Sequence, residues 1–283
     1  MSYVYLICII QQQRNITEQI ATFFTFILQR RYNAVMKKLK LIVIILAILS
    51  VGGGLAYWIH GRSQSAGTSS FTDVIDGFNK KAHSLTDPSS IWVVVNKQRP
   101  LDPKTYAPTL VVPQIPLRSN ITSDERQVAK VMATPLENMV NDAKKDGVAF
   151  DLESGYRSYN FQVTLYNSYV QQQGKAVADS QSARPGFSEH QTGLAADLGG
   201  KSKPVCNVET CYADTPEGKW LAANAYKYGF IIRYPSDKAH VTGYIYEPWH
   251  IRYIGTDLAT ELHNIHVETL EEFFGLGSAP DYK

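Results

Sequence analysis

The densest group of reactive side chains lies in one stretch, Ser188-Glu-His-Gln-Thr-Gly-Leu-Ala-Ala-Asp197. His190 and Asp197 are seven residues apart there, and the glycine and alanines between them let the backbone pass close to whatever both side chains bind. A second stretch, Glu247-Pro-Trp-His250, follows later in the chain. Two imidazoles and a carboxylate are a normal ligand set for a catalytic zinc ion that keeps one position open for water. The pattern predicts a Zn2+ site formed by His190, Asp197 and His250.

Glu247 is the spare carboxylate that the water of such a site needs as its base. In a flat strand Glu247 and His250 would point to opposite faces, because side chains alternate along a strand. Pro248 excludes regular ladder pairing, so we expect a bend that brings both groups towards the metal. Glu247 would then take a proton from the water and hand it to a leaving amine. The alternative is a surface glutamate beside a core Trp-His pair.

Arg157 lies in the segment Ser154-Gly-Tyr-Arg-Ser158, directly after an expected strand. A guanidinium in that turn can bind a substrate carboxylate through two hydrogen bonds or stabilise a tetrahedral oxyanion. The alternative is an exposed surface ion pair. Ser188 and Gln162 are further candidates for hydrogen bonds to a substrate.

Other histidines do not suggest a second site. His263 and His266 share a face of an expected helix, but their apolar neighbours indicate ordinary packing, and no third ligand is near them in the sequence. The chain contains no His-Glu-x-x-His motif, phosphate loop or dinucleotide fingerprint. Net charge is +2 with 19% charged residues, so nothing indicates a nucleic-acid partner.

The N-terminal region contains a predicted membrane anchor. Residues 41–59 are nineteen residues without a charge, which is enough to cross a bilayer. Lysines precede this run and the next cation after it is Arg62, so we expect the N-terminus inside and the rest of the chain outside the cell. A cleaved signal peptide is the alternative, because Gly52 to Ala56 supplies small residues, but the run ends in the interfacial pair Tyr57-Trp58, which favours an anchor. The anchor would place the catalytic part at the cell membrane, facing outward.

Cys206 and Cys211 would then lie in an oxidising environment, in a polar loop with four residues between them. We predict a disulfide between them. The alternative is a metal-binding or free thiol pair, but no further cysteine or histidine lies nearby in the sequence.

The expected elements mix helices and strands without a βαβ rhythm, which predicts an α+β fold with a small, mainly antiparallel sheet flanked by helices. We expect helices at 71–82, from the Ser123 cap to Gly147, and at 159–173, 176–183, 215–228 and 257–266. The helix after Ser123 should turn Val128, Val131, Met132, Leu136, Met139 and Val140 inward. We expect strands at 92–95, 148–152, 230–234 and 244–254.

Met36-Lys-Lys-Leu-Lys40 is similar to an ordinary start of a bacterial export signal, so we expect translation to begin at Met36. The expected organisation is a mis-assigned extension (1–35), the anchor or signal segment (36–60), a linker with a short helix (61–90), the catalytic domain (91–274) and a tail (275–283).

The two reactive stretches also carry a family resemblance. Ser-x-His-x-x-Gly-x-Ala-x-Asp followed by Glu-x-Trp-His resembles the VanY-type zinc D-alanyl-D-alanine carboxypeptidases, whose superfamily includes D-Ala-D-Ala dipeptidases and the hedgehog signalling domain. Segments 92–101, 154–158 and 242–244 match as well, so the resemblance covers about Ile91 to about Phe274.

The resemblance implies zinc on one face of the sheet, Arg157 at the substrate, and removal of terminal D-alanine from peptidoglycan stem peptides by D,D- or L,D-carboxypeptidase action. A peptidoglycan endopeptidase or a D-Ala-D-Ala dipeptidase on the same site is an alternative. A non-catalytic zinc-containing binding module is another. Glu247 and Arg157 argue against that module. The set of only three protein ligands does so too, because a structural zinc is usually closed by four.

Overall fold

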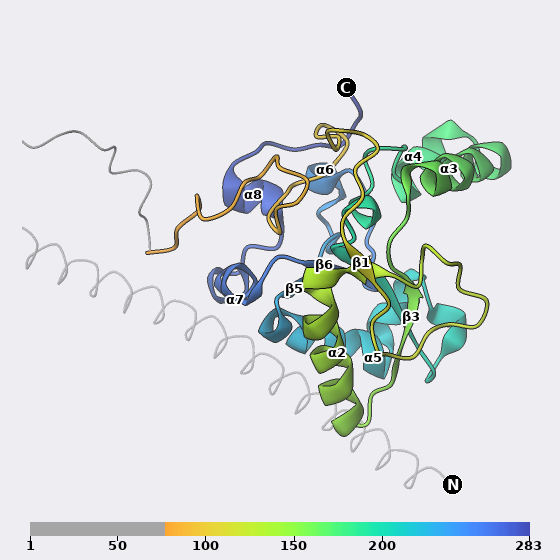
Figure 1. Cartoon of the computed structure of the whole chain (residues 1–283), viewed down its shortest axis with the longest axis vertical. Helices are drawn as coiled ribbons and strands as arrows, with labels where there is room; N and C mark the ends of the chain where they lie inside the picture. The colour runs from red at the N-terminus through yellow and green to blue at the C-terminus, as the bar shows by residue number, and fades with distance from the viewer. Residues whose placement is uncertain (1–76) are drawn as a thin grey trace, which may run out of the picture. The chain divides into compact units, whose positions relative to one another are not determined.

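A four-stranded antiparallel sheet, ordered β3-β4-β6-β5, organises residues 77–283, which are the part of the chain that this computed structural model describes (Figure 1). A separate pair joins β1 to β2. Helices flank the sheets, so the predicted α+β class is confirmed. The strands are β1 (Leu110–Val111), β2 (Val128–Ala129), β3 (Phe150–Ser154), β4 (Ala195–Gly200), β5 (Phe230–Ile232) and β6 (His250–Tyr253).

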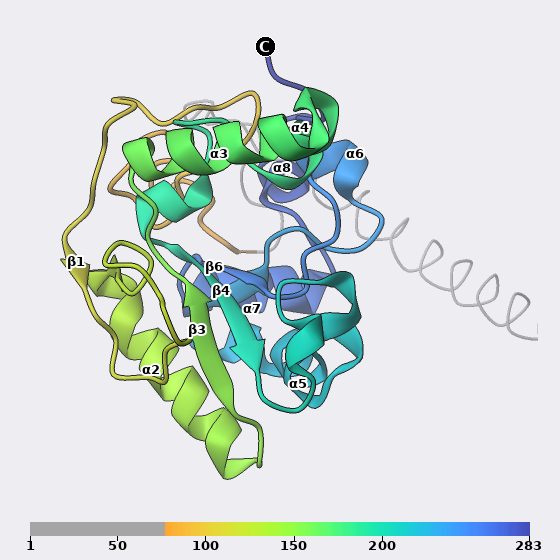
Figure 2. The same cartoon turned by 90° about the vertical axis from the view of Figure 1, so that its right-hand side faces the viewer.

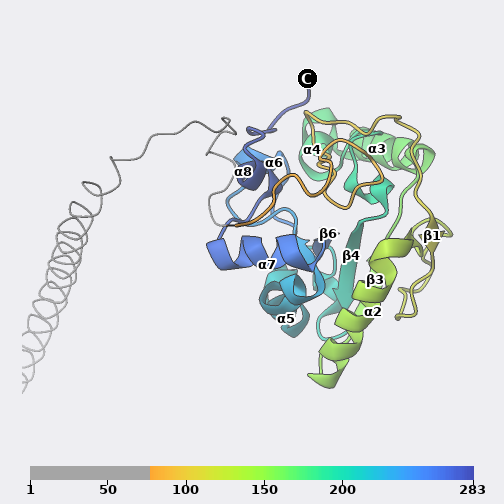
Figure 3. The same ribbon diagram turned by 60° about the vertical axis from the view of Figure 1, so that its left-hand side comes forward.

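The helices gather around this sheet at two ends. Figure 2 shows α3 and α4 across one end, with α2 and α5 towards the other. Figure 3 shows α7 on the side of β6, and α2 on the side of β3. The helices are α2 (Lys130–Lys145), α3 (Tyr159–Gln173), α4 (Lys175–Gln181), α5 (Pro216–Asn224), α6 (Ala239–Thr242), α7 (Thr256–Ile265) and α8 (Leu270–Phe274). Short 3-10 turns are η1 (Glu189–Thr192), η2 (Pro204–Cys206), η3 (Thr210–Asp214) and η4 (Ala225–Tyr228).

Strand β4 lies at the centre of the fold, between β3 and β6, and all six of its residues are buried. Its alanines and glycines leave room for larger neighbours. Leu198 points into the main hydrophobic core, together with Phe150 of β3 and Ile251 of β6. Helix α2 adds Met132, Leu136 and Met139 to the same cluster. Because side chains alternate along a strand, Asp197 points away from this core, to the opposite face of the sheet.

The predicted start of the helix after Ser123 was wrong. Ser123 lies in a turn, and α2 begins only at Lys130, with Ala129 at its N-cap. The carboxylate of Glu125 accepts hydrogen bonds from Thr122 and Arg118 within this turn. Residues 128–129 are instead drawn into pairing with β1. Met132, Leu136 and Met139 are on the buried face of α2 as predicted, but Val131, also predicted to be buried, is 52% exposed.

Three further expectations need correction. Residues 92–95 are buried but form no strand in a sheet, because Val94 donates to the Leu85 carbonyl in an irregular loop. Residues 77–82, the described part of the expected helix 71–82, form turns. The strand expected at 244–254 begins only at His250, since Pro248 lies in a turn before it. The predicted helix 159–173 is confirmed as α3, and α5 is capped by Thr215 as expected.

The predicted membrane anchor, residues 41–59, lies outside the described residues, as do Met36 and Cys8. Between residues 77 and 283, no helix is long and apolar enough to cross a membrane.

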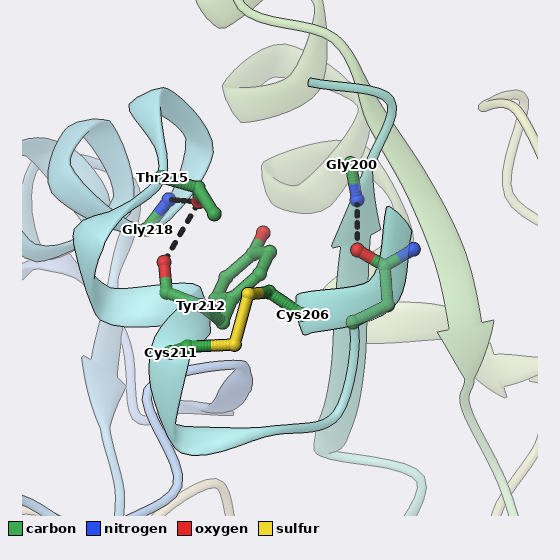
Figure 4. Close-up of a disulfide and its surroundings, with 7 residues drawn as sticks. Gly200, Cys206, Cys211, Tyr212, Thr215 and Gly218 are labelled. Atoms are coloured by element: carbon green, nitrogen blue, oxygen red, sulfur yellow. Dashed lines mark hydrogen bonds between the residues drawn. A yellow bond between two sulfur atoms is a disulfide. The ribbon is translucent and has the colours of Figure 1, made fainter. Parts of the chain in front are cut away.

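Cys206 and Cys211 form a disulfide, with their Cα atoms 5.3 Å apart (Figure 4). The bridge closes the loop between η2 and η3 and lies beside the ring of Tyr212, which is fully buried. The side chain of Asn207 accepts a hydrogen bond of 3.0 Å from the backbone of Gly200. The loop is therefore attached to the end of the central strand β4.

We predict that the double variant Cys206→Ser/Cys211→Ser lowers the free energy of unfolding by about 2 kcal/mol, the chain-entropy value for so short a loop. Denaturant titration of the full chain measures this, and the reduced wild type should match the variant. Thiol labelling of the unfolded, unreduced chain should mark Cys8 alone. Labelling of all three cysteines would refute the bridge.

Candidate active site

The register of three strands places polar residues side by side. Ser154 of β3 pairs with Asp197 of β4, and Asp197 pairs with His250 of β6. Directly opposite residues of antiparallel strands project from the same face of the sheet. His190 reaches this row from η1, the turn that precedes β4. Sheet pairing thus brings together residues from three distant parts of the sequence.

The three predicted metal ligands form one buried cluster. One potential ligand atom from each of His190, Asp197 and His250 lies within 4.8 Å of the others. His190 Nε2 is 3.3 Å from Asp197 Oδ2, and His250 Nδ1 is 3.2 Å from Asp197 Oδ1. All three side chains are about 4% exposed. The structure therefore brings the predicted triad together.

Gly155 orients the first of these histidines. His190 Nδ1 lies 2.6 Å from the carbonyl oxygen of Gly155, and a carbonyl can only accept, so Nδ1 carries the proton. Nε2 then presents its lone pair towards Asp197. A Cβ atom at position 155 would lie 2.2 Å from the carbonyl oxygen of Gln127, so only glycine fits this close approach.

The residues fit a divalent metal ion. Asp197 Oδ2 accepts a hydrogen bond of 2.6 Å from Arg157, whereas Oδ1 is buried with no hydrogen-bond partner among the described residues. A buried carboxylate oxygen without a donor is costly, and a cation beside it removes that cost. Two imidazole nitrogens and one carboxylate oxygen match the donor set of a zinc site with an open fourth position.

The site also controls the charge of its ligands. Burial alone would raise the pKa of Asp197, but the neighbouring histidines and Arg157 hold it well below its ordinary value. Burial and the Arg157 charge lower the pKa of His190, which favours the neutral, metal-binding form. For His250, burial opposes protonation, yet the neighbouring carboxylates of Asp197 and Glu189 raise its pKa to about 9. A bound metal must displace that proton.

Glu247 lies beside the cluster, as the Pro248 bend predicted. The amide of Glu247 donates to the Tyr234 carbonyl, and the Glu247 carbonyl accepts from the amide of His250 in a tight turn. This turn brings Glu247 Oε2 to 3.6 Å from His250 Nδ1. Burial raises the pKa of Glu247 to about 8. A carboxyl group with that pKa can both accept and release a proton near neutral pH.

The three candidate substrate residues lie around the same site. Arg157 Nε donates to Ser154 and Nη2 to Asp197, and the described residues give Nη1 no acceptor. The Ser188 hydroxyl is likewise without a hydrogen bond to the described residues. Gln162 differs, because its amide nitrogen donates to Ser182 and to the Ala183 carbonyl, and this leaves only its oxygen for a ligand.

All seven predicted metal, catalytic and substrate-binding residues line one cavity of about 430 Å³. One wall is α3, through Leu165 and Tyr169. Another is the disulfide-closed loop, through residues 208–210. Tyr234 and Tyr244 also line the cavity, as does Glu247. The site is thus a groove bounded by a helix on one side and a cross-linked loop on another. His263 lies outside it and stacks on Tyr226, at 3.6 Å between ring centroids.

Sequence reasoning missed a set of buried charges next to the metal ligands. Glu189 accepts hydrogen bonds from Arg233 and Arg252, and Arg233 also binds Glu271 through two hydrogen bonds. The signal was present, because each arginine interrupts an apolar strand. A charged residue in such a run is expected to be buried with a partner.

The chain is also similar to known proteins. The family model described as D-alanyl-D-alanine carboxypeptidase (VanY) matches residues 125–256. YodJ of Bacillus subtilis strain 168, a carboxypeptidase by name, is 40% identical over 207 residues, covering 72% of this chain and 73% of its own. The chain belongs to the VanY family of D-alanyl-D-alanine carboxypeptidases. The predicted family is confirmed.

Solved structures show the same fold with related activities. The LdcB LD-carboxypeptidase matches with a TM-score of 0.62 and 39% identity, covering 71% of this chain and 92% of its own. The vancomycin-resistance D,D-pentapeptidase VanY, solved with Zn(II), matches with a TM-score of 0.52 and 31% identity, covering 64% of this chain and 97% of its own. The chain is therefore a hydrolase of a peptidoglycan carboxypeptidase family.

We predict that Gly155→Ala lowers the free energy of unfolding by about 3 kcal/mol, because its new methyl group would overpack the Gln127 backbone. It should also weaken metal binding by displacing the carbonyl that orients His190. Gly147→Ala is the matched control: its Cβ meets nothing within 4 Å, so only the left-handed backbone opposes it, at about 1–2 kcal/mol. Equal losses in denaturant titrations of the two variants would contradict the close-approach argument.

Proposed function

We propose that the protein is a zinc-dependent carboxypeptidase that removes terminal D-alanine from peptidoglycan stem peptides. The observation that carries the proposal is the buried cluster of His190, Asp197 and His250 at the floor of a groove, with Glu247 beside it. Glu247 and the groove favour catalysis over a non-catalytic zinc-containing binding module, because the three ligands leave a position open to the cavity.

A bound zinc ion would polarise the scissile carbonyl and acidify the attacking water. His190, Asp197 and His250 would hold it. Glu247 accepts the proton of the attacking water and returns it to the departing amine, a role that its raised pKa suits. Arg157 is anchored by Ser154 and Asp197, which leaves Nη1 to bind the terminal carboxylate of the substrate or the developing oxyanion.

Which peptide bond of the stem peptide is cut is a more specific question. The solved relatives named above include an LD-carboxypeptidase and a D,D-pentapeptidase, so the likeness supports both actions. The cavity of about 430 Å³ is lined by α3 and by residues 208–210 as well as by the metal cluster. A cavity of this size favours a stem peptide over a free dipeptide as substrate.

We also propose that the catalytic domain works outside the cell and is held at the membrane by residues 41–59. The disulfide between Cys206 and Cys211 supports an oxidising compartment, because such bridges persist there and are rare in the reducing cytosol. Peptidoglycan stem peptides are present in that same compartment.

Glu247→Gln should retain zinc and lose turnover. The amide keeps the size of the side chain but cannot accept the proton of water, and loss of a general base costs about 10²–10⁴-fold. Zinc content by metal analysis and kcat on the penta- or tetrapeptide that the wild type cleaves test this in the full chain. A variant that kept its zinc and near wild-type turnover would end the assignment of Glu247 as the base.

The role of Arg157 predicts that the full chain cleaves penta- or tetrapeptides with a free C-terminus and ignores their C-terminally amidated forms. Mass spectrometry of the products distinguishes D,D from L,D action. Arg157→Gln should raise KM for the free-acid peptides and reduce the preference for them. Efficient cleavage of the amidated peptides would show that Arg157 does not recognise the substrate carboxylate, and it would indicate an endopeptidase. Fast cleavage of only D-Ala-D-Ala would indicate a dipeptidase.

A further inference from the structure

Two buried atoms next to the metal cluster face each other without any hydrogen bond. One is Oε2 of Glu189 and the other is Nε2 of His250, 3.7 Å apart. Both are buried and have no hydrogen-bond partner among the described residues. Buried polar atoms are almost always satisfied, so this pair calls for an explanation.

The other oxygen of Glu189 is already occupied. Oε1 accepts from Arg233 Nε at 2.8 Å and from Arg252 Nη1 at 2.7 Å. Both arginines are held elsewhere as well: Arg233 by two hydrogen bonds to Glu271, and Arg252 by the carbonyls of Ile91 and Val93. All four charged side chains are buried, and their formal charges sum to zero. Glu189 is therefore fixed in place, with Oε2 aimed at His250.

We propose that Glu189 is a positioning residue that holds His250 in one tautomer. A carboxylate oxygen only accepts, so Oε2 requires the proton on His250 Nε2. Nδ1 then carries the lone pair, and Nδ1 is the nitrogen that faces Asp197 Oδ1 at 3.2 Å. The separation of 3.7 Å is longer than a formed hydrogen bond, so a small rotation of the His250 ring must close it.

The proposal rests on the proposed zinc site and adds a difference between its two histidine ligands. His190 is protonated at Nδ1 by its contact with Gly155 and offers Nε2 to the metal. His250 is protonated at Nε2 and offers Nδ1. The two ligands therefore bind through different ring nitrogens, each selected by its own acceptor: a backbone carbonyl for His190 and a side-chain carboxylate for His250.

The first test uses the unaltered full chain, loaded with zinc and labelled with ¹⁵N. Histidine NMR spectra should show His190 protonated at Nδ1 and His250 protonated at Nε2. A zinc-loaded protein in which His250 carries its proton on Nδ1 would overturn the proposal and leave the zinc enzyme intact. A native chain that binds no zinc would overturn the proposed function, and this inference with it.

The second test compares Glu189→Gln with Glu271→Gln in competition titrations with a chromogenic zinc chelator. Each variant removes one buried carboxylate from the same arginine network, but only Glu189 faces His250. Zinc affinity should fall by about 10–100-fold in Glu189→Gln and stay unchanged in Glu271→Gln. Equal losses in both would show that Glu189 acts only through folding and would refute the positioning role. If Glu189→Gln does not fold, the spectra of the native protein decide alone.

Discussion

The backbone register between β4 and its two neighbours is the constraint on which the rest of the site depends. Pairing of Asp197 with Ser154 on one side and His250 on the other sets their spacing before any metal is considered. A slip of one residue would turn Asp197 into the hydrophobic core and Leu198 into the groove. The core contacts of Leu198 and Ile251 oppose that slip, so apolar packing on one face secures the geometry of the other.

A second constraint is the balance of buried charge. Taking an ion out of water costs several kcal/mol unless it is paired, so each charge beneath the groove needs a partner. Glu189 and Glu271 balance Arg233 and Arg252, while Arg157 covers one oxygen of Asp197. The cluster of His190, Asp197 and His250 is left with a carboxylate oxygen that no described donor reaches. This oxygen is therefore free to bind a cation.

The sequence was most informative where the reactive residues lie close together in the chain. His190, Asp197, Glu247 and His250 stand out because short motifs contain both the reactive groups and the glycine or proline that bends the chain around them. Helix α3 was equally clear, with a serine cap and a terminating glycine. The Arg233–Glu189 contact joins residues 44 positions apart, and no local pattern reports it. The start of α2 was missed for a similar reason, since residues 128–129 pair with β1 instead of continuing a helix from the Ser123 cap.

The arginine network has a consequence for how the protein is made. Its members extend from Asn96, which donates to Glu271, through Glu189 to Glu271 in α8. A nascent chain that has emerged only as far as β6 already has both arginines and Glu189 but lacks Glu271, so one carboxylate faces two guanidiniums. The positive charge left without a partner favours water over the interior. The candidate site, although its predicted ligands are all present once His250 has been made, therefore has to wait for synthesis of α8 before it can close.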